Sequence, residues 1–260
     1  MKINTLKINF LAAFTACTIL AIQSCGTNPQ KQVAEMKTIT LKSADSLDIT
    51  TDVYYSGYPE APVFLLFHQA GYSRGEYREI APKLNTWGFS CISIDQRSGK
   101  GVKDVENETF IMAQKLGKGT TYPDAMPDLE AALEFASKEF KDNKIIIWGS
   151  SYSAALSLVL GSRKYNNVIA ILAFAPGEYF EFEGRKIKEY AAEINVPVFI
   201  TSSFDEHKFW KEIFDTIPNS NKRYYLPDSA GYHGSKALWK EHPGHEGYWE
   251  AVEKFLQEVI

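Results

Sequence analysis

The segment Lys144-Ile-Ile-Ile-Trp-Gly-Ser-Ser-Tyr-Ser-Ala-Ala-Leu156 decides the fold of this chain. Its apolar first half predicts a strand that is buried on both faces. The strand breaks at Gly149, and an apolar helix begins almost at once. A strand, a sharp turn and a helix in this order are the setting in which a nucleophilic serine occupies the middle of a Gly-x-Ser-x-small motif. In Gly149-Ser150-Ser151-Tyr152-Ser153 that residue is Ser151.

Ser150 is the competing nucleophile. Such a turn strains the backbone of its middle residue, so the residues two positions away on either side have to be small. Around Ser151 these are Gly149 and Ser153, whereas around Ser150 one of them would be Trp148. We therefore prefer Ser151, although a helix N-cap is the other interpretation of the serine pair. The N-H of Tyr152 would then face a developing oxyanion, helped by the positive helix N-terminus.

An acid and a base are expected after the serine, in the order Ser, then Asp or Glu, then His. Asp205 follows the apolar run Val196–Thr201 in a turn, and therefore lies at the ligand-binding edge of a parallel sheet. We favour Asp205 as the acid. Glu206, the next residue, and Glu178, after the preceding strand, are alternatives, and a helix N-cap is the non-catalytic interpretation of Asp205.

His233 is the best-placed base, because it lies in a loop of small residues after the last predicted strand. A general base has to reach the serine, while a carboxylate on its other nitrogen fixes the tautomer. The second oxyanion donor is expected in the loop after the third strand, from the backbone N-H of Gln69 or Ala70. His68 comes too early in the chain to be the base and is interpreted as structural.

Short β-branched or aromatic runs alternate with longer helical patterns from residue 36 onward. This alternation predicts a three-layer α/β fold, with a mostly parallel central sheet and helices on both faces. We expect strands at 38–42, 48–55, 62–67, 89–94, 144–148, 168–174, 198–201 and 223–226. We expect helices at 75–87, 127–140, 152–163, 185–194, 206–217 and 247–259. The first two strands should be antiparallel, because a short connection joins them.

From about Pro62 to Ile260 the chain resembles the α/β-hydrolase superfamily, particularly the lidless esterases similar to dienelactone hydrolase. The segments that carry the resemblance are 66–71, the Ser151 turn, Ala175-Pro176-Gly177, the Asp205 turn and His233-Gly234. Two features depart from the pattern. Gln69 stands where many members carry Gly, and dienelactone hydrolases use a Cys nucleophile where this chain offers a serine, which shifts the expectation toward serine esterase chemistry.

The expected activity is hydrolysis of a carboxylic ester, or a similar acyl bond, in a small molecule through an acyl-enzyme. A serine peptidase and a non-catalytic binding protein on the same scaffold are the alternatives. This chemistry requires no metal or organic cofactor. His242 and His245 do not suggest a metal site, because Pro243-Gly244 between them prevents a helical face from presenting both rings.

Only about 20 residues separate Ala175 from Val196, too few for a large lid domain, so an open or shallow site is expected. Aromatic and apolar side chains in two loops are candidates for its walls, although core or loop packing is their other interpretation. They are Phe110, Met112 and Tyr122 in the first loop and Tyr179, Phe180 and Phe182 in the second.

The N-terminus has the pattern of an export signal. Lys2 and Lys7 precede the apolar run 8–22, which is shorter than the roughly 20 residues of a spanning helix. Ile22-Gln23-Ser24-Cys25 resembles a bacterial lipobox, so Cys25 is the predicted lipidation site. We expect a signal peptide at 1–24, a tether at 25–36 and one hydrolase domain at 37–260, lipid-anchored in the cell envelope outside the cytoplasm. An ordinary cleaved signal peptide is the alternative.

Composition narrows the partners. The formal net charge is −4, and loss of the two leader lysines would leave about −6. Since no basic stripe is available, the sequence argues against nucleic acid as a partner, and no obligate protein partner is evident. Cys17 would leave with the leader and Cys25 would carry lipid. Cys91 would then be the last free thiol, and we expect it to be buried and inert.

Overall fold

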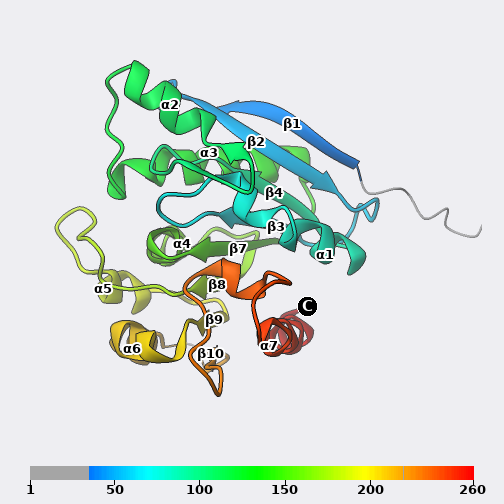
Figure 1. Ribbon diagram of the computed structural model, residues 1–260, viewed down its shortest axis with the longest axis vertical. Coiled ribbons are helices and arrows are strands. Elements are labelled where there is room, and N and C mark those ends of the chain that lie inside the picture. Colours follow the sequence, from blue (N-terminus) through cyan, green and yellow to red (C-terminus); the bar gives the residue numbers. More distant parts are fainter. Residues whose placement is uncertain (1–34, 219) are drawn as a thin grey trace, which may run out of the picture. The chain divides into compact units, whose positions relative to one another are not determined.

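The computed structural model describes residues 35–218 and 220–260. The predicted leader, Cys25 and the tether up to residue 34 lie outside the described residues. β1 begins at Glu35, two residues before the predicted start of the domain. An eight-stranded sheet lies at the centre, in the order β1-β2-β4-β3-β7-β8-β9-β10 (Figure 1). The strands are β1 (Glu35–Lys42), β2 (Asp48–Tyr55), β3 (Val63–Phe67), β4 (Ser90–Ile94), β7 (Ile145–Ser150), β8 (Val168–Phe174), β9 (Val198–Thr201) and β10 (Arg223–Tyr225).

The sheet is mostly parallel, which confirms the predicted fold class. β1 pairs with β2, and β2 with β4, in antiparallel fashion; every other pairing, from β4 to β10, is parallel. All eight predicted strands are present, each within three residues of its expected ends. The apolar runs located them because parallel strands buried on both faces leave few polar positions.

β7 illustrates how both faces are buried. Ile145 and Ile147 point into one apolar core, whereas Ile146 and Trp148 point into the other. Successive side chains of a strand face opposite sides of the sheet, so a continuous apolar run serves two cores at once. The Trp148 ring stacks on Phe174 of β8 with the centroids 4.7 Å apart.

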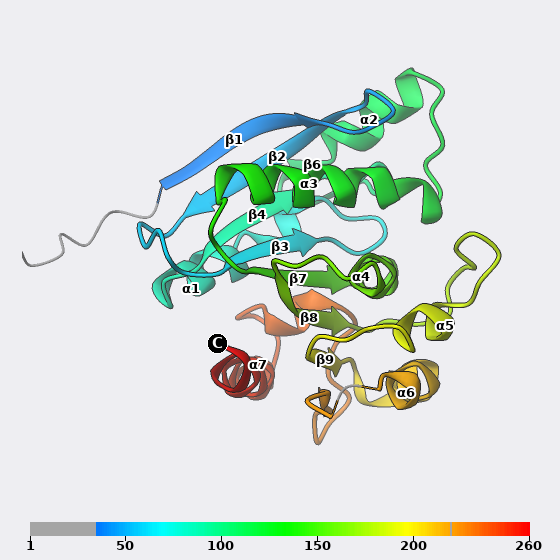
Figure 2. The ribbon, with the colours of Figure 1, turned by 180° about the vertical axis from the view of Figure 1, so that it is seen from behind.

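Helices cover the two faces unequally (Figures 1 and 2). Four helices pack on the first core, and two helices on the second. The first group is α3 (Met126–Glu139), α4 (Tyr152–Ser162), α5 (Ile187–Ala191) and α6 (His207–Thr216), and the second is α1 (Ile80–Thr86) and α7 (His245–Val259). The three layers that the sequence predicts are therefore present.

The structure differs from prediction around the first helix and after β4. The predicted helix at 75–87 is two elements, the 3-10 helix η1 (Arg74–Tyr77) and α1. After β4 come a short hairpin of β5 (Gly101–Val102) and β6 (Val105–Glu106) and the helix α2 (Glu108–Lys115), where a loop was expected. Asn107, whose side chain accepts a hydrogen bond from the Phe110 N-H at 2.8 Å, is the N-cap signal that this prediction overlooked.

Two expectations concern single features of the described part. Within residues 35–218 and 220–260, no helix has the length and apolar character to cross a membrane. Cys91 is a free and fully buried thiol, and its burial raises its pKa well above the ordinary value. Because the thiolate is the reactive form, Cys91 is inert, as the sequence predicts.

The buried Arg97–Asp128 ion pair fixes the loop that follows β4. Arg97 donates to Asp128 from its backbone N-H at 2.8 Å and from its guanidinium at 2.7 Å, and both side chains are almost fully buried. Burial raises the pKa of Asp128 to about 6, although Arg97 opposes this shift. These hydrogen bonds give Arg97 a bracing role between the loop after β4 and α3.

Replacing Arg97→Leu should lower the free energy of unfolding by about 3–5 kcal/mol, because it leaves the Asp128 carboxyl buried without its partner. Urea unfolding followed by circular dichroism measures the change. Lys138→Ala, which removes an exposed ion pair with Glu134, should leave the urea midpoint unchanged. Equal midpoints for the two variants would contradict the bracing role.

Candidate active site

Ser151 has the backbone of a strained strand-to-helix turn. Its φ is 58° and its ψ is −121°, a conformation that side-chain-bearing residues rarely adopt. The Ser151 N-H donates to the Phe174 carbonyl at 2.7 Å, and the Ser151 carbonyl accepts from the Ala154 N-H at 2.9 Å. The residue is thus joined to β8 on one side and to α4 on the other, while 8% of its surface remains exposed.

Gly149 is required by the approach of α4. A Cβ atom at this position would lie 2.3 Å from the Ser153 carbonyl oxygen and 2.6 Å from the Ala154 Cα. Ser153, the other small residue of the motif, donates its hydroxyl to the His68 carbonyl at 2.6 Å. The two small residues therefore have different roles: Gly149 gives space to the helix, and Ser153 joins the turn to the loop after β3.

The structure brings Ser151 and His233 together. The Ser151 Oγ and the His233 Nε2 are 2.8 Å apart, and the His233 Nδ1 hydrogen-bonds to the Glu206 Oε1. A carboxylate accepts only, so Nδ1 carries the proton and Nε2 is free to accept from the serine hydroxyl. This is the arrangement in which an imidazole activates a serine.

Glu206, and not Asp205, is the carboxylate at His233. Ser203 precedes the 3-10 helix η3 (Phe204–Glu206) as its N-cap, and the Glu206 Oε2 accepts from the Ser203 hydroxyl at 2.7 Å and from its N-H at 3.3 Å. This capping box turns the Glu206 carboxylate back toward the base, whereas the Asp205 side chain is exposed. The pattern Ser203-x-x-Glu206 is the sequence signal that would have favoured Glu206.

Contacts between loops position the base. The Phe204 N-H donates to the Ala230 carbonyl at 2.9 Å, which joins the acid loop to the loop that carries His233. Gly234, with a φ of 71°, allows that loop to close on the nucleophile turn, since a Cβ there would lie 2.5 Å from the Ser150 Oγ. Three segments distant in sequence therefore hold one histidine.

The environment keeps Glu206 ionised. Burial by itself would raise its pKa, but hydrogen bonds from His233 and Ser203 bring the pKa below the ordinary value. An ionised Glu206 stabilises the imidazolium that forms when His233 takes the serine proton.

The oxyanion donors follow the prediction in part. Tyr152 is the first residue of α4, so its N-H has no acceptor within the helix. The Gln69 N-H is occupied, because it donates to the Glu76 Oε2 at 2.7 Å. Of the two candidates in this loop, Gln69 is excluded by that bond and Ala70 is left.

His68 has a structural role, as the sequence indicates. The ring is fully buried, and burial lowers its pKa to about 4. Its Nε2 accepts from the Gln96 N-H at 3.0 Å, so its Nδ1 carries the proton and donates to the Gln69 carbonyl at 2.8 Å. The neutral ring therefore fixes the loop after β3.

Three of the six candidate wall residues lie near Ser151. Tyr179 lies beside Ser151, and its hydroxyl donates to the Ala175 carbonyl at 2.8 Å. Tyr122 stacks on Tyr152 with a centroid separation of 4.5 Å and contacts Phe180 edge-on. The other three lie elsewhere: Phe110 and Met112 in α2, which packs against β2, and Phe182 against Tyr190.

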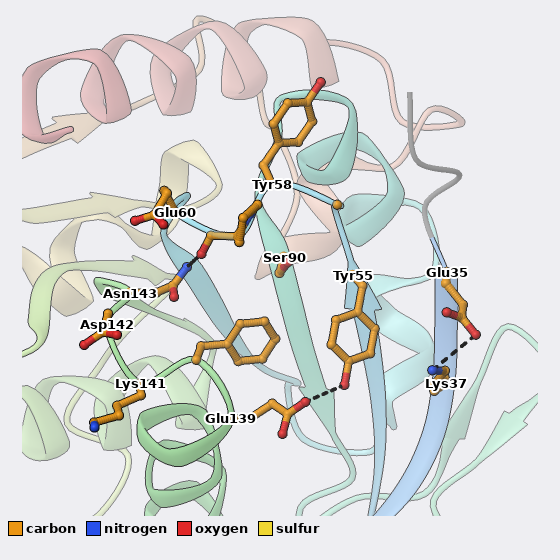
Figure 3. A pocket seen from close by; sticks show the side chains of 13 residues that line it. Glu35, Lys37, Tyr55, Tyr58, Glu60, Ser90, Glu139, Lys141, Asp142 and Asn143 are labelled. Atoms are coloured by element: carbon orange, nitrogen blue, oxygen red, sulfur yellow. Dashed lines mark hydrogen bonds and ion pairs between the residues drawn. The ribbon is translucent and has the colours of Figure 1, made fainter. Parts of the chain in front are cut away.

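A cavity of about 720 Å³ lies away from this site (Figure 3). It lies at the opposite edge of the sheet, where β1 and β4 begin, and Tyr55, Tyr58 and Asn143 contribute to its lining. The interactions drawn in Figure 3 include the bond of the Tyr55 hydroxyl to Glu139 at 3.2 Å. None of its residues pairs a nucleophile with a base.

No group of three or more His, Cys, Asp or Glu side chains among residues 35–218 and 220–260 is arranged to hold a metal ion. The His242 ring stacks on Tyr232 with a centroid separation of 3.8 Å, and His245 lies 3.1 Å from Glu246. The side chains of the site that are joined by hydrogen bonds into a nucleophile, a base and an acid are Ser151, His233 and Glu206.

The fold and this constellation define a serine hydrolase of the α/β-hydrolase class. A family model described as serine aminopeptidase, S33, matches residues 59–211, more than half of the chain. The chain belongs to this family and is a hydrolase, as the sequence predicts. The matched range includes Ser151 and Glu206 and ends before His233. A comparison with curated protein sequences found no match.

Solved structures share the fold. An esterase from Pyrococcus furiosus is 16% identical with a TM-score of 0.67, over 87% of this chain and 93% of that one. Dienelactone hydrolase from Anabaena variabilis is 12% identical with a TM-score of 0.68, over 87% and 99%. An acylaminoacyl peptidase from Pyrococcus horikoshii is 13% identical with a TM-score of 0.57, over 87% of this chain and 45% of that one. The α/β-hydrolase resemblance is thereby confirmed at the level of the fold.

Glu206→Gln should lower the rate of aryl-ester cleavage by about 10²- to 10⁴-fold, because the amide neither fixes the tautomer nor stabilises the imidazolium. Asp205→Asn is the matched control and should keep the wild-type rate. The measurement is kcat/KM for p-nitrophenyl acetate at pH 8. The opposite ranking of the two variants would restore Asp205 as the acid.

Proposed function

We propose that the protein hydrolyses a carboxylic ester of a small molecule through an acyl-enzyme on Ser151. The observation that carries the proposal is the continuous set of hydrogen bonds from Ser151 through His233 to Glu206. Serine is a weak nucleophile unaided, and a general base within hydrogen-bond distance activates it.

The reaction runs in two halves. In the first, the Ser151 Oγ attacks the ester carbonyl while His233 takes its proton, and His233 then returns the proton to the departing alcohol. In the second half, His233 activates a water that attacks the acyl-enzyme and frees the acid. The N-H groups of Tyr152 and Ala70 are the proposed oxyanion donors, and Glu206 orients the ring throughout.

We expect a small acyl group with a leaving alcohol that extends into solvent, because only about 20 residues between Ala175 and Val196 are available to cover the site. Tyr122, Phe180 and the 39% exposed Tyr179 offer an aromatic edge beside the nucleophile. Such an edge favours an aromatic or ring-containing alcohol over a long acyl chain.

A serine peptidase is the second candidate, because the description of the matched family is that of an aminopeptidase. An aminopeptidase has to pair the substrate ammonium with an acid near the nucleophile. Glu178 follows β8, but its two oxygens accept from the N-H groups of Ile187 and Lys188 at 2.7 and 2.9 Å. Glu206 is engaged with His233. The ester function is therefore the better supported of the two.

We further propose that Cys25 carries a lipid anchor and holds the catalytic domain outside the cytoplasm, in the bacterial cell envelope. The support is the lipobox pattern that ends at Cys25. Glu35, where β1 begins, lies at the sheet edge opposite Ser151. An anchor that joins the domain at that edge would leave the active site accessible to soluble esters.

Ser151→Ala should abolish turnover of p-nitrophenyl acetate and labelling by a fluorophosphonate probe. Wild-type protein should cleave acetyl esters faster than octanoyl esters and should leave amino-acid p-nitroanilides intact. The panel is read by p-nitrophenol or p-nitroaniline absorbance. Ser150→Thr, which keeps a hydroxyl next to the nucleophile, should still label. A Ser151→Ala protein that labels, or faster cleavage of the anilides, would refute the ester assignment.

Cys25→Ala should abolish incorporation of radiolabelled palmitate in a bacterial host and should move the protein from the detergent phase to the aqueous phase in Triton X-114. Lipidation requires the thiol of this cysteine. Cys91→Ala is the control and should retain the label, because that thiol is buried in the domain. Labelled Cys25→Ala protein would leave the anchor unsupported.

A further inference from the structure

Glu76 is a fully buried acid behind the candidate active site. It lies in η1, and its carboxylate accepts two hydrogen bonds, one on each oxygen. Oε2 accepts from the Gln69 N-H at 2.7 Å, and Oε1 accepts from the Ser150 hydroxyl at 2.8 Å. The first donor belongs to the loop after β3 that contains Gln69 and Ala70, which we call the oxyanion loop. The second donor, Ser150, is the residue next to the nucleophile.

The bond to the Gln69 N-H completes the fixation of one peptide unit. The other end of the His68–Gln69 peptide is the His68 carbonyl, which accepts from the Ser153 hydroxyl at 2.6 Å. Because a peptide unit is planar, holding its oxygen and its N-H sets the orientation of the whole plane. That plane leads directly into Ala70, the proposed oxyanion donor.

Through Ser150, Glu76 is also connected to the loop that carries His233, which we call the base loop. The Ser150 Oγ donates to Glu76 and accepts from the Ser235 N-H at 2.8 Å. Ser235 is two residues from His233, so one carboxylate connects the oxyanion loop, the nucleophile turn and the base loop. η1 itself is held by the buried pair of Arg74 and Asp95, 2.6 Å apart.

Burial of a carboxylate away from cations is unfavourable, so the position calls for a compensating role. Within the described residues, no ion pair of 4 Å or less involves Glu76. The carboxylate of Glu76 is therefore not there to pair with a cation. Its carboxylate is instead stabilised by the two hydrogen bonds from the active-site loops.

We propose that Glu76 is a positioning residue whose ionised carboxylate sets the oxyanion loop against the nucleophile turn, so that its protonation lowers the rate of the proposed reaction. The inference rests on the proposed serine-hydrolase function. It adds a second acid, unconnected to the base by a direct hydrogen bond, on which catalysis depends.

The two protonation states of Glu76 differ in what they can accept. The ionised form accepts from both the Gln69 N-H and the Ser150 hydroxyl. A protonated carboxyl has to donate from one oxygen, and of these two partners only the Ser150 hydroxyl could accept. Because that hydroxyl already accepts from the Ser235 N-H, its own proton would then lose the acceptor that Glu76 provides. Burial raises the pKa of Glu76 to about 7, although the hydrogen bonds from Gln69 and Ser150 oppose the shift. As the pH falls through about 7, the ionised form and its positioning effect are lost.

Four other titratable groups act on this carboxylate. His233 on the base loop and Lys236 in the 3-10 helix η4 (Ser235–Leu238) favour the ionised form. Tyr72 and Tyr77, on the same side as Glu76, are neutral in this pH range, and burial raises the pKa of both. A positive charge on His233 or Lys236 therefore stabilises the ionised state of Glu76.

The test compares wild-type protein with Glu76→Gln and Glu79→Gln between pH 5 and 9. Glu79, three residues further along, bonds to Lys103 and to the Lys240 N-H outside this network, so it is the matched control. Readouts are kcat and KM for p-nitrophenyl acetate, the rate constant of fluorophosphonate labelling, and the thermal midpoint.

Glu76→Gln should lower kcat about 10- to 100-fold, less than or equal to the loss of an oxyanion donor, with KM changed less than about 3-fold. Its amide keeps the volume and can accept from the Gln69 N-H, but its N-H₂ then faces the Ser150 hydroxyl, which loses the acceptor that Glu76 provides. The decisive readout is the acid side of the log kcat/KM profile. Protonation of Glu76 should make this side of the profile steeper in wild type and Glu79→Gln than in Glu76→Gln, which has no carboxyl at this position.

A purely structural role would lower the thermal midpoint and leave the slope of the profile unchanged. Wild-type kcat and a wild-type slope in Glu76→Gln would overturn the inference. If Glu76→Gln does not fold, Ser150→Ala replaces it. That variant removes the link to both Glu76 and Ser235 and should lower kcat about 5- to 50-fold; an unchanged kcat overturns the inference.

The two proposals fail in different ways. Folded wild-type protein that neither labels nor cleaves esters would overturn the serine-hydrolase function, and with it the role of Glu76. Wild-type protein that labels on Ser151, beside a Glu76→Gln protein of equal rate and equal slope, would overturn the role of Glu76 alone.

Discussion

The backbone reversal at Ser151 is the constraint on which the rest of the site depends. A φ of 58° at a non-glycine residue persists only where the surroundings hold it. Here the helix α4 packs so closely on the end of β7 that a Cβ at Gly149 would collide with it. Tyr152 follows directly as the first residue of α4, so the nucleophile and one proposed oxyanion donor arise from one local feature.

The parallel sheet gathers the other groups. Ser151 follows β7, Glu206 follows β9 and His233 follows β10, and the carboxyl ends of parallel strands meet at one edge. A common sheet edge brings these groups only roughly together, however, and hydrogen bonds between the loops fix their relative positions. The Phe204–Ala230 contact joins acid and base loops, and Ser150, Ser153 and the peptide of Gln69 join the nucleophile turn to the oxyanion loop.

Two carboxylates with opposite environments serve the same site. Glu206 is partly exposed and accepts from His233 and Ser203, so its pKa is lowered. Glu76 is fully buried without a paired cation, so its pKa is raised to about 7. One stays ionised wherever His233 can act as a base, and the other changes its state near neutrality. Different burial of similar groups is how a single fold separates their roles.

Residue patterns alone predicted the sheet, the two-sided core, and Ser151 and His233 as nucleophile and base, because buried strands and a strained turn leave local patterns. They favoured Asp205 as the acid, whereas the direction of the η3 turn brings the adjacent Glu206 to His233. No sequence pattern predicted that the Gln69 N-H donates to Glu76 or that Glu76 lies behind the site. Both features depend on contacts between η1, the loop after β3 and the nucleophile turn. Tertiary structure decided these points because a hydrogen bond between distant segments is set by how the elements pack, and not by residue type.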